Sequence, residues 1–474
     1  MKAEILFTGL RDNSTGPLYQ RLAESVREAV RRGEAGAGSK LPSERDLARA
    51  LGVSRTTVVG AYRLLRDEGL LESERGSGTR IVASNRDIGP ATPTATMPSG
   101  KLTDELAPGV LDLSGSVVAG LDGLPDLSVG AVDLGDLATD VAYRPLGLPE
   151  LREQIAVRCT RLGLPTVPEE ILITNGAQQA ITLLCVLFGR NGGVIVTENP
   201  TYAGVIDAAR SVGATVLALP TDAEGLEVGA LREALNRSRV SLLYIMTTCQ
   251  NPTGTTMSTR RRHQISRLAE QAGVPIVDDT TLADLVFHGS WHPLQIHGEA
   301  VVVGSLSKLF WPGLRVGWLR GPRELVLRLG RLKVVADLGS SYIAQRTALG
   351  LLPSAADVAE ARRGQLCTRL DLLAGLLLTR VPAWSFTRPS GGPFLWVRLP
   401  CSDGEAFAQF AMQYGVRVLP GIRTSADRRF GNYLRLSFVA EPADIQSAVG
   451  KLADAWAAFE SVGRSERISF DIVV

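Results

Sequence analysis

One lysine of this 474-residue chain stands where covalent chemistry is feasible. Lys308 follows the apolar run 300–303, which predicts a buried strand, and the segment Ser305-Leu306-Ser307. The amine of a lysine in a loop after a strand can form a Schiff base with a carbonyl compound. The two serine hydroxyls and Arg315, seven residues further on, could hold a phosphate beside it. The alternative is an ordinary lysine at a strand end.

The surrounding sequence predicts an α/β sheet that would position this lysine. From about residue 109, short apolar runs alternate with amphipathic helical patterns, which is typical of a doubly wound sheet. We expect strands at 171–174, 194–197, 215–219, 242–246 and 275–278. Long helices are expected from 321 to about 380, followed by a smaller α+β portion with strands at 394–397 and 433–438. In such sheets, ligands bind in loops at the carboxyl ends of the strands.

Several of these loops carry suitable side chains. The segment 175–179 begins a helix after a strand, and the backbone amides at the start of that helix could bind a phosphate. Tyr202 could stack on a flat heterocycle, or be a half-buried structural tyrosine. Asn251, in Asn251-Pro252-Thr253-Gly254, presents its amide to the same region. Asp278 could keep a pyridine nitrogen protonated, or be a helix cap or turn acid.

Taken in order, these residues resemble the fold-type I aminotransferases, which use pyridoxal 5′-phosphate, over residues 110–460. The segment 143–152 and the late Arg435 belong to the same resemblance. It implies that Lys308 forms the Schiff base (internal aldimine) with the cofactor, and that Asp278 pairs with the pyridine nitrogen. It also implies that Asn251 contacts the ring hydroxyl oxygen and that Tyr202 stacks on the ring. Tyr143 would reach the phosphate of the neighbouring subunit. The residues implied to hold the phosphate are Gly176, Ala177, Gln178, Ser305, Ser307 and Arg315.

Two positions in this resemblance leave alternatives open. Arg435 would bind the α-carboxylate of an amino acid through its two-pronged guanidinium, but a strand arginine is also common on protein surfaces. The family commonly has a tyrosine shortly after the aspartate, and here we assign that position to Thr280. Threonine is shorter and a far weaker acid, so we expect cofactor binding to persist and transamination to be weak or absent.

The first eighty residues predict a separate helical domain. Pro17 precedes a helical pattern, Ser43 caps a second helix that stops at Gly52, and Ser54 caps a third. Two short helices joined by a tight turn form a helix-turn-helix, and the segment 70–82 reads as two strands around a Gly-Ser-Gly turn.

These motifs resemble the winged helix-turn-helix of GntR-family bacterial regulators. The match includes Leu41-Pro42-Ser43-Glu44-Arg45-Asp46-Leu47-Ala48, Leu51-Gly52-Val53-Ser54-Arg55-Thr56-Thr57-Val58 and Gly76-Ser77-Gly78-Thr79. The resemblance implies that residues at the helix starts and in the wing contact DNA: Ser43, Arg45, Ser54, Arg55, Thr56, Thr57, Arg75 and Gly78. The alternative is a small helical docking domain with incidental arginines.

Composition sets outer limits on the protein class. The five cysteines are scattered without a CxxC pair, which argues against a disulfide framework or a zinc site and suits a cytoplasmic protein. No signal peptide or membrane span is expected. The Pro-, Thr- and Ser-rich segment 83–108 predicts a flexible linker. We therefore expect a DNA-binding domain at 1–82, a linker at 83–108, an aminotransferase-like domain at 109–460 and a tail at 461–474.

The combination resembles the MocR subfamily of GntR-type regulators. It implies a transcription regulator that binds operator DNA and senses pyridoxal phosphate, an amino acid or an amine through Lys308. It also implies a head-to-tail homodimer, whose heads could read direct or inverted half-sites. The alternative function is a pyridoxal-phosphate-dependent aminotransferase with an appended DNA-binding head, which a steady-state assay with amino and keto acids would distinguish.

Overall fold

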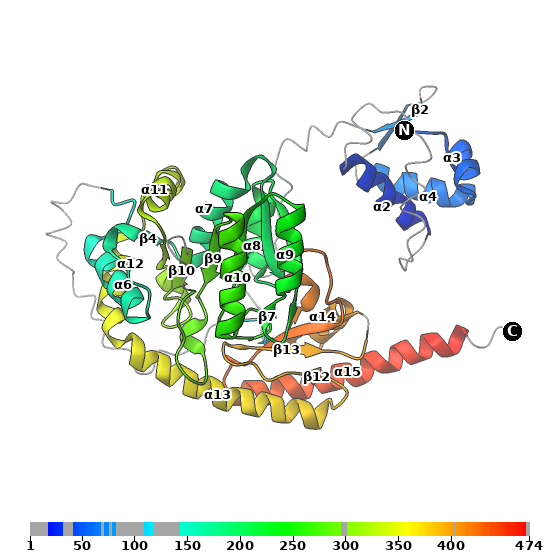
Figure 1. Ribbon diagram of the computed structural model, residues 1–474. Helices are drawn as coiled ribbons and strands as arrows, with labels where there is room; N and C mark the ends of the chain where they lie inside the picture. Colours follow the sequence, from blue (N-terminus) through cyan, green and yellow to red (C-terminus); the bar gives the residue numbers. More distant parts are fainter. Residues whose placement is uncertain are drawn as a thin grey trace. The chain divides into compact units, whose positions relative to one another are not determined.

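A computed structural model describes residues 18–31, 41–67, 71–74, 78–81, 109–116, 143–294, 301–401 and 403–470 (Figure 1). Internal contacts divide the chain into two compact units, residues 1–92 and 93–474. The division falls within the segment 83–108 predicted as a linker, which lies outside the described residues.

The small unit contains three helices and a two-stranded hairpin. Their bounds are α2 (Leu18–Arg31), α3 (Glu44–Leu51), α4 (Arg55–Asp67), β1 (Leu71–Glu74) and β2 (Gly78–Ile81), with β1 and β2 antiparallel. Ser43 caps α3 by accepting from the Asp46 amide, and Gly52 ends it with a left-handed φ of 64°. Leu22, Leu47 and Tyr62 pack in a common core. The predicted helix-turn-helix and wing strands are thus present.

The large unit is built on an eight-stranded mixed sheet in the order β4-β11-β10-β9-β8-β5-β6-β7. The strands are β4 (Ile171–Thr174), β5 (Val194–Asn199), β6 (Thr215–Asp222), β7 (Gly225–Leu226), β8 (Val240–Ile245), β9 (Ile276–Asp279), β10 (Val301–Ser305) and β11 (Gly317–Arg320). From β10 to β6 the strands are parallel, while β11 is antiparallel to both of its neighbours and β7 to β6. The carboxyl ends of the parallel strands therefore meet at one edge.

Helices cover both faces of this sheet (Figure 1). They are α6 (Pro149–Arg161), α7 (Ala177–Gly189), α8 (Ala203–Ser211), α9 (Val228–Arg237), α10 (Thr259–Ala272), α11 (Arg323–Asp337) and α12 (Tyr342–Leu351). Buried residues of α7, α8 and α11 pack with Tyr244 and Val277 on one face. Those of α9 and α10 pack with Ile245 and Ile276 on the other, because successive strand residues point to opposite faces.

A smaller sheet follows the long helix α13 (Ala355–Arg380). Its order is β12-β13-β16-β15, all antiparallel, and α14 packs against β15 and β16. The elements are β12 (Ser385–Phe386), β13 (Phe394–Arg398), α14 (Gly404–Gln413), β15 (Leu419–Pro420), β16 (Tyr433–Ser437) and α15 (Pro442–Phe470). The helix α15 extends into the segment 461–474 that the sequence analysis treats as a tail. The predicted α/β architecture with a smaller α+β subdomain is confirmed.

One short segment joins the start of the large unit to this subdomain. β3 (Leu111–Asp112) pairs in parallel with β14 (Val416–Arg417). The Ser437 amide also donates to the Leu113 carbonyl at 2.7 Å. The segment 109–116 is thereby fixed beside β16, although its sequence alone predicted no strand.

Candidate functional site

Lys308 lies in the turn that follows β10, at the sheet edge where the parallel strands end. Its Nζ donates to the Ser116 Oγ at 2.5 Å, across 192 positions of sequence. Ser116 is carried by the segment 109–116, which β14 and β16 hold in place. The sequence analysis missed Ser116, because no local pattern indicates which distant hydroxyl reaches the lysine.

A concave, amide-lined turn begins α7 and faces Arg315. Gly176 precedes the helix with φ of 77°, and the Arg315 Nη2 donates to the Asn175 carbonyl at 2.7 Å. A Cβ on Gly176 would stand 3.0 Å from the Arg315 Nη2. A Cβ on Gly317 would lie 2.6 Å from the Gly176 carbonyl carbon. Glycine at both positions therefore allows the first strand residue of β11, the α7 start and the guanidinium to approach closely.

The predicted serines and tyrosine border this turn. Ser305 and Ser307 are buried, their hydroxyls lie 3.0 Å apart, and the Ser307 amide donates to the Ser305 Oγ at 3.2 Å. The Tyr202 hydroxyl donates to the Gln178 Oε1 at 2.9 Å. Burial raises the pKa of Tyr202 to about 12, so its hydroxyl stays protonated at neutral pH. Helix-start amides, hydroxyls and an arginine are the donors that a phosphate requires.

Arg435 is a buried residue of β16 rather than a surface arginine, with 9% of the residue exposed. Its Nη1 donates to the Asn251 Oδ1 at 3.0 Å and its Nη2 to the Ser114 carbonyl at 2.8 Å. The guanidinium carbon lies 3.8 Å from the centroid of the Phe394 ring. Burial lowers the pKa of Arg435 to about 10, and its Nε has no hydrogen-bond partner among the described residues. The Arg435 guanidinium is positioned to donate to a carboxylate in place of the Ser114 carbonyl.

Asp278 and Asp279 point to opposite faces of β9, which runs one residue beyond the predicted strand end. Asp278 accepts hydrogen bonds from the Leu294 amide at 2.9 Å and the Thr247 hydroxyl at 3.0 Å. Asp279 accepts from the Tyr244 hydroxyl at 2.6 Å and the Thr281 amide at 2.9 Å.

The charges around Asp279 place it on the side of Lys308. Burial raises the pKa of both carboxyls. The nearby Lys308 charge opposes the rise at Asp279, whereas the Arg262 charge opposes it at Asp278. Asp279 also helps to raise the pKa of Tyr202. The structure thus brings Asp279, rather than the predicted Asp278, to the group formed by Lys308 and Tyr202.

Thr280 is not directed at this group. Its amide and its hydroxyl both donate to the Val303 carbonyl of β10, each at 2.9 Å. The phenol that reaches the carboxylate is instead Tyr244, a residue of β8 that the sequence analysis did not select. Alternation along the strand could not have separated the two aspartates, because Ile276 and Val277 are both buried and give opposite choices, and no local pattern indicates the tyrosine partner.

Tyr143 lies at the molecular surface, with 73% of the residue exposed. Its neighbour Arg144 packs against Gly339, where a Cβ would lie 3.2 Å from the Arg144 carbonyl oxygen. The exposed ring is available to a second molecule.

In the small unit, the predicted DNA-contacting residues gather at the starts of α3 and α4. The Ser54 Oγ lies 2.8 Å from the Thr56 hydroxyl and 2.7 Å from the Thr57 hydroxyl. Arg55 is exposed, and its Nη2 lies 3.7 Å from the Glu44 Oε2 of α3. Ser43 and Arg45 also lie at the start of α3, and Gly78 begins β2. Arg75 lies outside the described residues.

The residues around Lys308 fit pyridoxal 5′-phosphate. The Gly176 turn, the two serines and Arg315 supply phosphate donors, Tyr202 supplies a flat ring, and Asp279 supplies a buried acid. When bound, this cofactor supplies an aldehyde that reacts with primary amines and a pyridine ring that withdraws electrons. The chain supplies the amine, the phosphate donors and the acid.

Comparison with known proteins places both units in families. Residues 131–452 match the family of aminotransferases of class I and II, and residues 18–81 match the bacterial regulatory proteins of the gntR family. The solved structure of LysN, an α-aminoadipate aminotransferase from Thermus thermophilus, superimposes with a TM-score of 0.69 at 28% identity, covering 76% of this chain and 95% of LysN.

Relatives that match over two thirds or more of their length include proteins described as regulators. The uncharacterized HTH-type transcriptional regulator YisV of Bacillus subtilis is 29% identical, covering 92% of this chain and 96% of YisV. The probable rhizopine catabolism regulatory protein MocR of Rhizobium meliloti is 27% identical, covering 68% of this chain and 69% of that protein. The chain belongs to the class I and II aminotransferase family. With its GntR-type head, it is a member of the MocR subfamily of regulators, whose aminotransferase fold implies pyridoxal 5′-phosphate as cofactor.

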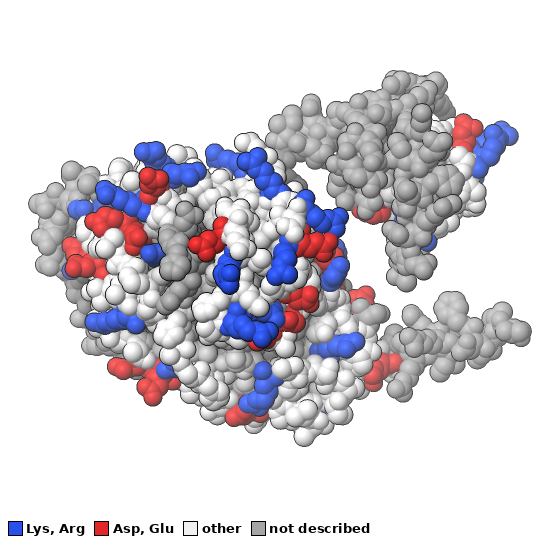
Figure 2. All heavy atoms as spheres, in the orientation of Figure 1, with Lys and Arg blue, Asp and Glu red and all other residues white. Residues whose placement is uncertain are grey.

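The surface charge on one face of the large unit differs from that of a basic groove, the kind of surface that nucleic acids typically bind. On the face of the large unit shown in Figure 2, basic and acidic side chains are interspersed. This face therefore offers no field of one sign to a nucleic acid.

Within the described parts of the chain, no helix is long and apolar enough to cross a membrane.

Proposed function

We propose that this protein is a cytoplasmic transcription regulator that binds operator DNA through its small unit and pyridoxal phosphate through Lys308. A bound amino compound would then change its affinity for DNA. The observation that carries the proposal is the assembly of Lys308, the phosphate donors and Arg435 in one site of a chain that also has a helix-turn-helix.

Within this proposal, Asp279 replaces Asp278 as the acid that pairs with the pyridine nitrogen. Support comes from strand alternation, which puts Asp279 on the same face as Val277 and Tyr244. The positive charge near Asp279 is that of Lys308, whereas the positive charge near Asp278 is that of Arg262. In this proposal Arg315, Ser305, Ser307 and the α7 amides hold the phosphate, and Asn251, which accepts from Arg435, contacts the ring hydroxyl oxygen.

In this proposal, the segment 109–116 transmits the effect of ligand binding to the DNA-binding head. Its Ser116 hydroxyl accepts from Lys308, and its Ser114 carbonyl accepts from Arg435. A ligand that engages the lysine amine and presents a carboxylate to the arginine competes with both contacts. Because this segment directly follows the predicted linker 83–108 in sequence, its release would lengthen the tether between the head and the large unit.

The response requires a ligand that distinguishes two states of this segment. A ligand shifts a conformational equilibrium only by the difference in its affinity for the two states. The cofactor aldehyde, by taking the lysine amine, competes with the Lys308 contact to Ser116, and the carboxylate of an amino acid competes with the Arg435 contact to the Ser114 carbonyl. Amines without a carboxylate would leave the Arg435 contact in place and shift the equilibrium less.

The protein acts as a homodimer in this proposal. Apolar and aromatic side chains are exposed near Gly339: Tyr143 at 73%, Val335 at 88% and Ile343 at 57%. Exposed apolar patches of this kind are typical of protein interfaces. A second copy that covers them would bring its own Tyr143 to the first copy's phosphate site and provide two heads for two half-sites.

The test is to add pyridoxal phosphate to purified protein, reduce it with borohydride and locate the modified peptide by mass spectrometry. We expect a visible absorbance band in the wild type and a pyridoxyl group on Lys308. Lys308→Ala should lose the band and retain its far-ultraviolet circular dichroism. Modification of another lysine, or no band after reconstitution, contradicts the proposed cofactor site.

A further inference from the structure

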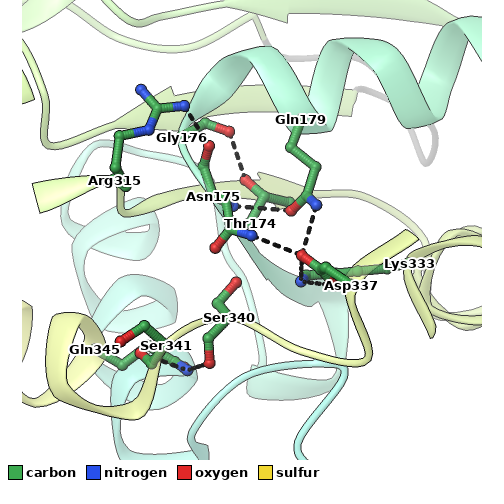
Figure 3. A network of polar contacts seen from close by, with 10 residues as sticks. All are labelled: Thr174, Asn175, Gly176, Gln179, Arg315, Lys333, Asp337, Ser340, Ser341 and Gln345. Atoms are coloured by element: carbon green, nitrogen blue, oxygen red, sulfur yellow. Dashed lines mark hydrogen bonds and ion pairs between the residues drawn. The ribbon is translucent and has the colours of Figure 1, made fainter. Parts of the chain in front are cut away.

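A buried ion pair lies behind the turn that begins α7 (Figure 3). The Lys333 residue has 0% exposed surface, and its Nζ lies 2.7 Å from each carboxylate oxygen of Asp337, one turn later on α11. Burial lowers the pKa of Lys333, while Asp337 opposes this effect. A buried charge of this kind requires its partner, because removing one member leaves the other uncompensated.

The same carboxylate also holds two side chains of the phosphate turn. The Asp337 Oδ2 accepts from the Asn175 Nδ2 and from the Gln179 Nε2, each at 2.6 Å. The Gln179 Oε1 in turn accepts from the Asn175 backbone amide at 2.9 Å. Asn175 is therefore held through both its side chain and its main chain.

The fixed peptide of Asn175 has a direct effect on the arginine. Its carbonyl accepts from the Arg315 Nη2 at 2.7 Å, so the orientation of this peptide sets where the guanidinium stands. The next residue, Gly176, is held as well, because its amide donates to the Thr174 carbonyl at 2.9 Å. Figure 3 shows Asn175, Gln179 and Arg315 around this turn, with Asp337 and Lys333 on the opposite side of Asn175 from the guanidinium.

We propose that Asp337, with Lys333 as its counter-charge, is a positioning residue that fixes Asn175, Gln179 and thereby Arg315 for binding the phosphate of the cofactor. This inference rests on the proposed function and adds a residue pair that does not itself touch the ligand. The pair acts through the turn, so its loss should weaken binding of a phosphate-bearing ligand more than binding of the same ring without phosphate.

The experiment compares two variants that share one substitution. Lys333→Met removes the buried cation and leaves Asp337 to accept from both amides. Lys333→Met/Asp337→Leu removes the acceptor as well, without leaving a buried unpaired charge. The dissociation constants for pyridoxal 5′-phosphate and for pyridoxal, which lacks the phosphate, are measured by absorbance titration of the cofactor-free, full-length protein.

We expect the double variant to bind pyridoxal phosphate at least tenfold more weakly than the wild type does, which corresponds to about 1.4 kcal/mol, and Lys333→Met, whose Asp337 has lost its counter-charge, to lie between them. The dissociation constant of the double variant for pyridoxal should stay within about twofold of the wild-type value. Equal losses for both ligands indicate general damage and overturn the inference, as does an unchanged affinity for pyridoxal phosphate. A wild type that binds neither ligand contradicts the proposed function as well.

A milder variant keeps the test decisive if the double variant does not fold. Gln179→Met removes one donor to Asp337 and the acceptor of the Asn175 amide, and retains the ion pair. We expect a loss of at least about threefold for pyridoxal phosphate, which corresponds to about 0.7 kcal/mol, and none for pyridoxal, since the turn loses two hydrogen bonds, one of them to a carboxylate. An equal loss for both ligands overturns the inference here too.

Discussion

Asp278 and Asp279 are adjacent in sequence and lie in two different environments. Asp278 accepts from the Thr247 amide and hydroxyl and the Leu294 amide, and the positive charge near it is that of Arg262. Asp279 accepts from Tyr244 and Thr281, and the positive charge near it is that of Lys308. A single position along the strand therefore separates two buried carboxylates with different neighbours.

Substituting each aspartate by asparagine should separate these roles. Asp279→Asn should weaken pyridoxal phosphate binding about tenfold or more and shift its absorbance, because the acid opposite the pyridine nitrogen is lost. Asp278→Asn should lower the melting temperature and leave that affinity within about threefold. Absorbance titration and thermal unfolding of both variants measure this. The reverse pattern would restore Asp278 as the ring partner.

Glu198 is a second buried acid near this pair, on β5. Its Oε2 accepts from the Met246 amide at 2.9 Å, and its Oε1 has no partner among the described residues. Burial raises the pKa of Glu198 from its ordinary value of 4.5 to about 8, and the charges of Asp278 and Asp279 add to the rise. The folded protein therefore keeps a proton that the unfolded chain has released between these two pH values.

This difference in bound protons predicts a pH dependence of stability. Because the folded-state pKa is the higher one, the free energy of unfolding should fall as pH rises from about 4.5 to about 8. Glu198 contributes a slope of about 1.4 kcal/mol per pH unit in that window. Urea unfolding of cofactor-free wild type and Glu198→Gln should show a smaller slope in the variant. Parallel curves would mean that Glu198 does not hold the proton.

The chemical types of the site residues could be predicted from sequence, but their mutual contacts could not. Lys308 and Arg315 stand out because a lysine and an arginine at that spacing follow an apolar run. Ser116 and Asp337 do not, because their roles depend on segments that are distant in sequence and meet only in the fold. The sequence pattern favoured Asp278 because it ended the predicted strand there, whereas β9 runs on to Asp279.

At the scale of elements, the segment 109–116 makes contacts that its length does not suggest. β3 has two residues, yet the segment holds both Lys308 and Arg435 through Ser116 and Ser114. If ligand binding displaces this segment, weakening it should favour the bound state. A substitution in this segment therefore tests whether the affinity for the cofactor rises or falls, as well as by how much it changes.

Ser116→Ala should increase the affinity for pyridoxal phosphate by about three- to tenfold, since one competing hydrogen bond of roughly 1 kcal/mol is removed. Ser114→Ala is the comparison, because it retains the backbone carbonyl that Arg435 contacts and removes only the hydroxyl that donates to the Asp112 carboxylate within the segment. This comparison variant should change affinity by less than about twofold. A weaker affinity in Ser116→Ala would show that this hydroxyl binds the cofactor instead of competing with it.

The helix α4 carries the predicted contacts to DNA. Arg55→Ala should weaken binding to a duplex selected from a random pool, because the exposed guanidinium at the helix start is lost. A phosphate contact predicts an equal loss on all sequences and a salt slope smaller by about one. Arg237→Ala, an exposed arginine of the large unit, is the control and should bind like wild type. Normal binding by Arg55→Ala would exclude this helix start as a contact.

Regular elements with a clear period were predictable, and those defined by distant partners were not. Ser43 and Gly52 mark the ends of α3 because a cap and a left-handed glycine act locally. The strands β3 and β14 were missed because each has two residues and its partner lies far away in the chain, so periodicity within them is absent.

For the whole molecule, the central claim is that the two units are coupled. An aminotransferase fold by itself would support an enzyme, and a helix-turn-helix by itself would support DNA binding without a small ligand. Coupling between ligand and DNA binding is typically about 1–3 kcal/mol, or roughly 5- to 150-fold in affinity. Such coupling is reciprocal, so DNA should also change the affinity for the ligand.

The most direct measurement is the dissociation constant for a selected operator duplex, with and without pyridoxal phosphate and a panel of α-amino acids and ω-amino acids. We predict that, for wild type, at least one combination changes this constant about fivefold or more. Lys308→Ala should bind the duplex with a constant that no ligand changes. An identical wild-type constant under all conditions, or an unaltered response in Lys308→Ala, would contradict the account.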